Sequence, residues 1–234
     1  PAYQNDAMNA AVVMGLYGTS RPSASVAITR AECVYFLYML KNCTTAPTPE
    51  SLARFSKITI EDGDATYMLR NMVAAEVKII PDFFIDLFNS GDFTLILSNS
   101  ISKYSDKKYD DNITLEGKTT SNSTGKRMVL FPAADEYTAL YHELGHVVAI
   151  TQKLKNTTFL NDVWKYDAAG AKELTGWYSQ TNPDECWAEA FEYLMTNQND
   201  SEKMALAKMN MPVSYAYFNS LVEFGQEYEK SKAS

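Results

Sequence analysis

The stretch His142-Glu143-Leu144-Gly145-His146 contains both histidines of the 234-residue chain. In an α-helix, residues four apart lie about 40° apart around the axis and about 6 Å apart along it, so two imidazoles can bind one Zn²⁺ from the same side. Glu143 would stand beside the open coordination position, where a carboxylate can take a proton from zinc-bound water and later deliver it to the leaving amine. The stretch therefore predicts a catalytic zinc site on a helix, with His142 and His146 as ligands and Glu143 as the base.

The alternative interpretation is a pair of histidines that bind no metal. Two histidines placed at random would take this spacing, with a glutamate directly after the first, in about one chain in two thousand. The spacing therefore favours the metal site.

A catalytic zinc site needs a third protein ligand, and with no histidine left it must be an aspartate, a glutamate or a cysteine. The best candidates follow Asn182 and Pro183, which are typical of a helix start. Three glutamates would share one face of this helix: Glu185, Glu189 and Glu192.

Other interpretations of this second helix stay open. Glu185 stands three residues after Asn182, where a glutamate can also complete a capping box. The row of glutamates could be a solvated face. Cys186 could bind zinc by its chemistry, but on a helix it points about 100° away from Glu185, toward the apolar side.

The motif helix, the seven-residue spacing of Tyr178 and Glu185, and the sequence Trp187-Ala188-Glu189-Ala190-Phe191 together resemble the catalytic domain of anthrax toxin lethal factor and the related clostridial Pro-Pro endopeptidases. The resemblance spans residues 57–234. It implies that His142, His146 and Glu185 hold zinc and that Glu143 is the base. It also implies that Tyr178 donates its hydroxyl to the oxyanion and that Glu189 orients a ligand histidine.

One departure concerns the polar loop before the catalytic helix. The Pro-Pro endopeptidases carry a tryptophan there that shapes the proline-accepting site. In this chain the tryptophans are Trp164, Trp177 and Trp187, all after the motif. The sequence therefore does not favour cleavage between prolines.

Residues 1–46 resemble the second half of a surface-layer homology repeat. The matching residues are Gly15-Leu16-Tyr17-Gly18, Arg21-Pro22 and Ile28-Thr29-Arg30-Ala31-Glu32. The resemblance implies a secreted or cell-surface bacterial protein that associates with the cell wall. The alternative is a small helical segment that packs on the next domain. Residues 47–56 are predicted to be a linker and residues 57–234 the peptidase domain.

The fold class predicted for that domain is α+β, with a small mixed β-sheet, the motif helix and a second ligand-bearing helix. Sequence patterns place helices at 64–77 and 82–89, strands at 93–98 and 127–131, and a polar surface loop at 102–126. The motif helix is expected to start at Pro132. The strand at 127–131 is expected to be a sheet edge to which an extended substrate adds.

Composition excludes some classes of function. A formal net charge of −8 argues against a nucleic-acid partner. The sequence has no run of about 18 apolar residues, so it predicts no transmembrane segment. Three cysteines do not form a disulfide framework. The predicted function is a zinc-dependent endopeptidase acting on a protein or peptide. Alternatives are a non-catalytic surface module with a structural zinc, which would not need Glu143, and a zinc hydrolase of non-peptide amides.

Overall fold

The computed structural model describes residues 48–61, 65, 67–104, 115–123, 125–131 and 138–233. The surface-layer-like segment at 1–46 lies outside these residues, so that resemblance stays a prediction. Helix α3 (Pro49–Phe55) occupies most of 47–56, the segment expected to be a linker. Thr48 begins this helix, and its hydroxyl accepts a hydrogen bond from the backbone N–H of Ser51.

Two compact units divide the chain, and each consists of several segments. The first unit lies within Pro1–Lys78, Ile96–Glu116 and Val129–Thr138, and the second lies within Ile79–Leu95, Gly117–Met128 and Ala139–Ser234. Because the two units alternate along the sequence, this division cuts across the domain predicted at 57–234, whose boundaries stay a prediction.

The sheet is small and mixed, as predicted. Within the described residues its strand order is β1-β2-β4-β3. The strands are β1 (Ile60–Glu61), β2 (Phe93–Leu97), β3 (Gly117–Asn122) and β4 (Gly125–Leu130). The strands predicted at 93–98 and 127–131 are therefore confirmed as β2 and β4, and the α+β class is confirmed with them.

Two expectations about this sheet are wrong. The polar composition of 102–126 predicts a loop, but part of it forms β3. The strand at 127–131 is not a sheet edge, because β4 lies between β2 and β3. The described residues of β3 after Gly117 are half-buried or exposed, so this strand lacks the apolar alternation by which strands are recognised. Its two threonines nevertheless suit a pleated, half-buried strand.

The first unit contains α3, α4 (Tyr67–Glu76), the start of the 3₁₀ helix η2 (Val77–Ile79) and α6 (Ile101–Tyr104). Helix α3 packs against α4, the helix expected at 64–77. A buried apolar cluster joins the ends of β2 and β4 through Ile96, Val129 and Phe131.

The motif helix is shorter than predicted. Helix α7 (Leu140–Thr151) begins at Leu140 and not at Pro132, because Thr138 is not helical. Thr138 is bound to Glu76 of α4: its backbone N lies 2.7 Å from Glu76 Oε1, and its hydroxyl bonds to Oε2. This tie gives the chain an alternative to a helical hydrogen bond directly before α7.

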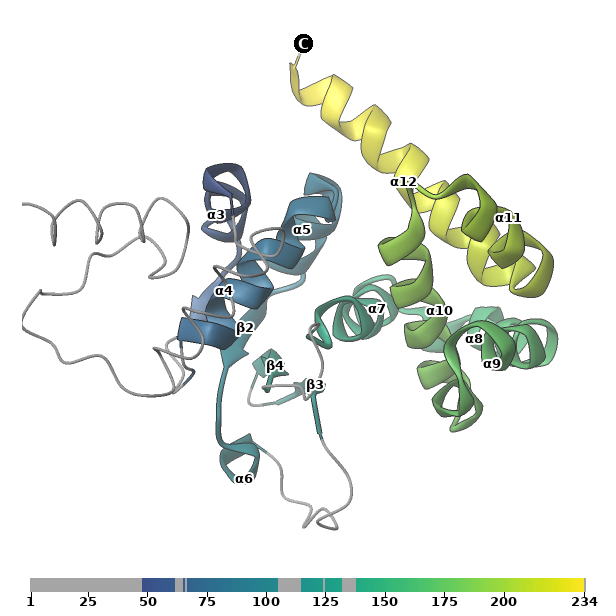
Figure 1. The fold of residues 1–234 in the computed structure, drawn as a ribbon, viewed down its shortest axis with the longest axis horizontal. Coiled ribbons are helices and arrows are strands. Elements are labelled where there is room, and N and C mark those ends of the chain that lie inside the picture. The colour runs from purple at the N-terminus through teal and green to yellow at the C-terminus, as the bar shows by residue number, and fades with distance from the viewer. Residues whose placement is uncertain are drawn as a thin grey trace, which may run out of the picture. The chain divides into compact units, whose positions relative to one another are not determined.

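The second unit is mostly helical. Its helices are α5 (Asp82–Ser90), α7, η3 (Leu154–Asn156), α8 (Phe159–Tyr166), α9 (Ala168–Thr175), η4 (Trp177–Gln180), α10 (Pro183–Asn197), α11 (Ser201–Asn210) and α12 (Pro212–Ala233). The long yellow helix beside α11 is α12 (Figure 1). Helix α5 confirms the prediction at 82–89. None of the described helices is long and apolar enough to cross a membrane.

Three buried phenylalanines from different helices of this unit pack against one another. The ring centroids of Phe84 and Phe191 are 5.5 Å apart, and those of Phe191 and Phe218 are 5.6 Å apart. Edge-to-face rings at such distances stabilise a core beyond the area they bury. The cluster therefore joins α5, α10 and α12.

Candidate metal centre

Helices α7 and α10 approach each other closely at Gly145, in the middle of the motif. A Cβ atom at Gly145 would lie 3.0 Å from Ala188 Cα and 3.1 Å from Phe191 Cβ. The buried indole of Trp187 donates a hydrogen bond of 2.9 Å to the Gly145 carbonyl oxygen. A buried indole N–H needs such a partner. The close contact therefore sets the separation of the two helices that carry the predicted ligands.

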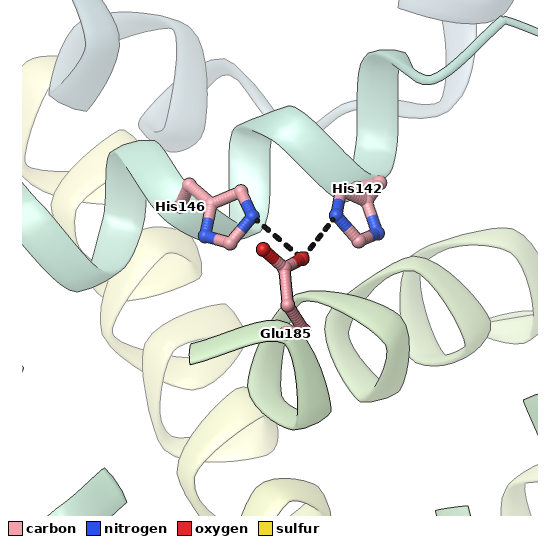
Figure 2. A group of neighbouring side chains, drawn as sticks. All are labelled: His142, His146 and Glu185. Atoms are coloured by element: carbon pink, nitrogen blue, oxygen red, sulfur yellow. Dashed lines mark hydrogen bonds and ion pairs between the residues drawn. The ribbon is translucent and has the colours of Figure 1, made fainter. Parts of the chain in front are cut away.

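Helix α10 begins as its sequence predicts. The Asn182 side-chain oxygen accepts hydrogen bonds from the backbone N–H groups of Asp184, at 2.9 Å, and Glu185, at 3.1 Å. Pro183 occupies the first turn, where its missing N–H costs nothing. The Glu185 carboxylate points to the histidines of α7 and not back to the start of its own helix (Figure 2).

The structure brings His142, His146 and Glu185 together. Glu185 Oε2 lies 3.0 Å from His142 Nε2 and 3.2 Å from His146 Nε2. One ligand atom from each residue lies within 4.8 Å of the other two, so the three atoms can surround one ion (Figure 2). Two imidazole nitrogens and one carboxylate oxygen are a donor set that suits catalytic zinc, which leaves a fourth position for water or substrate.

The ionisation of these groups follows from the same contacts. Burial lowers the pKa of His142, but hydrogen bonds to Glu185 and Glu189 and the charge of Glu143 outweigh burial and raise that pKa to about 10. Burial raises the pKa of Glu185, but hydrogen bonds to the two histidines hold that pKa well below its usual range. The lowered pKa keeps the Glu185 carboxylate ionised, which is the form in which a carboxylate binds a divalent cation.

The other nitrogen of His142 faces two further glutamates of α10. His142 Nδ1 lies 3.0 Å from Glu189 Oε1 and 3.8 Å from Glu192 Oε2. A carboxylate on Nδ1 fixes the ring and directs the lone pair of Nε2 toward a metal. Glu189 was predicted to orient a ligand histidine, and the structure places it on His142. Glu192 was predicted only to share this helix face, and its proximity to His142 adds a second carboxylate.

Glu143 is almost fully buried, with 4% of its surface exposed. Among the described residues, its Oε2 has no hydrogen-bond partner. Burial raises the pKa of this carboxyl, while the charges of His146 and His142 oppose the rise. A buried carboxylate oxygen without a partner costs free energy. Glu143 therefore fits a site in which a further polar group, such as a water molecule on a metal, completes its hydrogen bonds.

Strand β3 contacts Glu143 from the sheet. The Thr119 hydroxyl donates a hydrogen bond of 3.2 Å to the Glu143 backbone oxygen. Gly117 faces the Glu143 side chain, and any Cβ added there would overlap it. Neither residue was a candidate from the sequence, because the strand that carries them resembles a loop.

Tyr178, in η4, lies beside His142, one of the predicted metal ligands. Its ring centroid is 5.8 Å from that of His142 and 5.7 Å from that of Trp177. The Tyr178 side chain is 41% exposed, so a molecule in solution can reach it. Gly176 precedes η4 with φ 101°, a conformation that favours glycine, and so lets the chain turn toward α10 at this point.

Cys186, the alternative ligand, is fully buried on the apolar side of α10. Burial and the charges of Asp167 and Glu189 raise the pKa of its thiol to about 12. Since the thiolate is the form that binds metals, this cysteine is a poor ligand.

A family model and a solved structure both resemble this chain. The model of the family described as "Anthrax toxin lethal factor, N- and C-terminal domain" matches residues 96–221. The structure of the Pro-Pro endopeptidase PPEP-2 from Paenibacillus alvei has the same fold, with a TM-score of 0.51, 14% sequence identity, and coverage of 72% of this chain and 99% of that chain.

A further structure, from Bacteroides caccae, is provisionally described as a zinc-binding metallo-peptidase. It matches with a TM-score of 0.31 and 14% identity over 89% of each chain. No curated protein matches the sequence. The family model covers more than half of the 234 residues and includes both α7 and α10. The chain therefore belongs to the anthrax toxin lethal factor family, the zinc metallopeptidase family that its motif and its helix pair resemble.

Proposed function

We propose that this protein is a zinc-dependent endopeptidase. The observation that carries the proposal is the convergence of His142, His146 and Glu185 on one point, with the buried carboxylate of Glu143 on the same helix. Two nitrogens, one oxygen and an open fourth position match the ligand number of catalytic zinc sites.

A zinc ion bound there would acidify a water molecule and polarise the substrate carbonyl. Glu143 would take the proton of the attacking water and deliver it to the leaving amine, since its Oε2 has no hydrogen-bond partner among the residues that the structure describes. Tyr178 would donate its hydroxyl to the carbonyl oxygen as that oxygen gains charge. Glu189 would hold His142 through Nδ1 during both steps.

Substrate binding would use β3 and not the strand at 127–131. Strand β3 lies at the edge of the described sheet and packs against α7. An extended peptide can add to such an edge through backbone hydrogen bonds, with alternate side chains in pockets. A crystal structure with a bound peptide tests this placement, and a peptide away from β3 would contradict it.

The rival function, a structural zinc in a non-catalytic module, fits less well. Structural sites usually fill the fourth position with cysteine or histidine. This chain has no third histidine, and Cys186 lies buried on the apolar side of α10. A structural site would also not explain why the carboxylate of Glu143 is buried beside the histidines.

The test of the function is a peptide-library digest read by mass spectrometry, with and without a chelator. We expect cleavage at defined bonds that stops when zinc is removed and returns when zinc is added. Cleavage of amides that are not peptides, and of no peptide in the library, would support the remaining alternative instead.

Metal content gives a second prediction. The purified protein should hold about one zinc per chain, and Glu185→Ala should lose most of it, because two ligands hold zinc far less well than three. Glu189→Ala should weaken zinc binding by about 10- to 100-fold, as expected for a partner of a ligand histidine. Elemental analysis and competition with a chelator measure both effects.

The matched control is Cys186→Ala, next to Glu185 on the same helix. It removes the sulfur donor that the sequence leaves open as a third ligand, and it should leave zinc affinity unchanged. If this variant loses zinc and Glu185→Ala keeps it, the third ligand is misassigned.

Location is a separate proposal. The surface-layer resemblance of residues 1–46 supports a secreted or cell-surface bacterial protein that associates with the cell wall. Cosedimentation of the full chain with purified cell walls tests it, with a variant that starts at residue 47 as the control.

A further inference from the structure

We propose that strand β3 positions the catalytic carboxylate, and that Gly117 leaves the space in which the Glu143 side chain lies. The inference rests on the proposed function, in which Glu143 is the base. It adds a residue that acts through Glu143 and touches neither the metal nor the substrate carbonyl.

The first evidence is the contact distance at Gly117. A Cβ atom built on this residue would lie 2.5 Å from Glu143 Cγ, 2.6 Å from its Oε1 and 2.9 Å from its Cδ. Real Cβ contacts are essentially never shorter than 3.0 Å. All three atoms belong to one side chain, so the space left by Gly117 is the space of the Glu143 carboxylate.

The second evidence is that the same strand holds the Glu143 backbone. Two residues along β3, the Thr119 hydroxyl donates to the Glu143 carbonyl oxygen. The carboxylate is almost fully buried, so it has no ready route into solvent. With its backbone tied to Thr119 and its side chain against Gly117, Glu143 depends on β3 for its position.

The backbone conformation of Gly117 allows a test that distinguishes the positioning of Glu143 from a role in the stability of the strand. Its φ is not in the left-handed region, unlike that of Gly125 and Gly176, so the backbone can accept an alanine. Gly117 is the first residue of β3, and alanine loses less conformational entropy on folding than glycine does. The obstacle to a methyl group is a side chain and not backbone. Gly117→Ala should therefore move the carboxylate without unfolding the strand.

The experiment compares zinc-loaded wild type with Gly117→Ala. We expect kcat to fall by about 10²-fold, the loss that a displacement near 1 Å in a reacting group can cause. KM and zinc content should stay unchanged, and the melting temperature should stay the same or rise. A crystal structure of the variant should show the Glu143 carboxylate displaced, with His142, His146 and Glu185 in place.

The matched control is Gly125→Ala, at the first residue of β4. Its Cβ would meet nothing within 4 Å, but its φ of 136° disfavours alanine. This variant should therefore lose thermal stability and keep kcat, which is the opposite result.

Three outcomes would overturn the proposal: an unchanged kcat in Gly117→Ala, a fall in kcat that only follows a fall in melting temperature, or a crystal structure with Glu143 undisturbed. Failure of the proposed function is distinguishable. In that case the wild type cleaves no peptide, while a displaced Glu143 in the variant crystal would still support the positioning role.

Discussion

Glu143→Ala should lower turnover by about 10²–10⁴-fold, the range expected when a general base is removed, while zinc stays bound. The expected zinc retention follows from the geometry, because Glu143 does not belong to the group His142, His146 and Glu185 that converges on one point. The measurements are kcat on a cleaved peptide and zinc content by elemental analysis.

Glu143→Ala is also expected not to lower the thermal stability of the protein. Burial of a carboxylate costs free energy, so replacing Glu143 with alanine should leave the melting temperature unchanged or raise it. Glu173→Ala, an exposed glutamate of α9, is the matched control and should keep full activity. If Glu143→Ala loses zinc, or cleaves at the wild-type rate, Glu143 is not the base.

Tyr178→Phe should lower kcat by about 10²–10³-fold, which corresponds to about 2.7–4 kcal/mol of transition-state stabilisation from one oxyanion donor. Phenylalanine keeps the ring and its contact with His142 and removes only the hydroxyl. KM, zinc content and melting temperature should therefore barely change, since the hydroxyl would act only when the carbonyl oxygen gains charge.

The matched control is Tyr166→Phe, an exposed tyrosine at the end of α8 that lies 56% exposed. It should keep the wild-type kcat. If Tyr178→Phe also keeps it, or loses activity only in step with stability, then Tyr178 packs against the site and another group must stabilise the oxyanion.

The two ligand helices were predictable because the information for each is local. Spacing of four residues places His142 and His146 on one side of α7, and the pair Asn182-Pro183 marks the start of α10. The structure then places Glu185 between the histidines through contacts that no single helix pattern contains. The resemblance to a known family supplied that link.

Strand β3 could not be recognised, because an edge strand with polar residues on its open face has the composition of a loop. Its contacts with the catalytic helix are also distant in sequence: Thr119 and Glu143 are 24 residues apart. Such contacts depend on the strand order, and the sequence predicts 127–131 as the sheet edge where the structure has β3. The tie between Thr138 and Glu76, which precedes α7, was invisible for the same reason.

The hydrogen bond from Trp187 to Gly145 makes tryptophan fluorescence an intrinsic probe of the packing of α7 and α10. Trp187 is fully buried between the two ligand helices, whereas Trp177 is 74% exposed and Trp164 is 37% exposed. With those two replaced by phenylalanine, the remaining indole fluorescence would come from Trp187, which also packs on Phe159 of α8 and Tyr217 of α12. A red shift of its emission would then report loosening of the helices around Trp187, so their packing could be followed in solution without a substrate and without an added label.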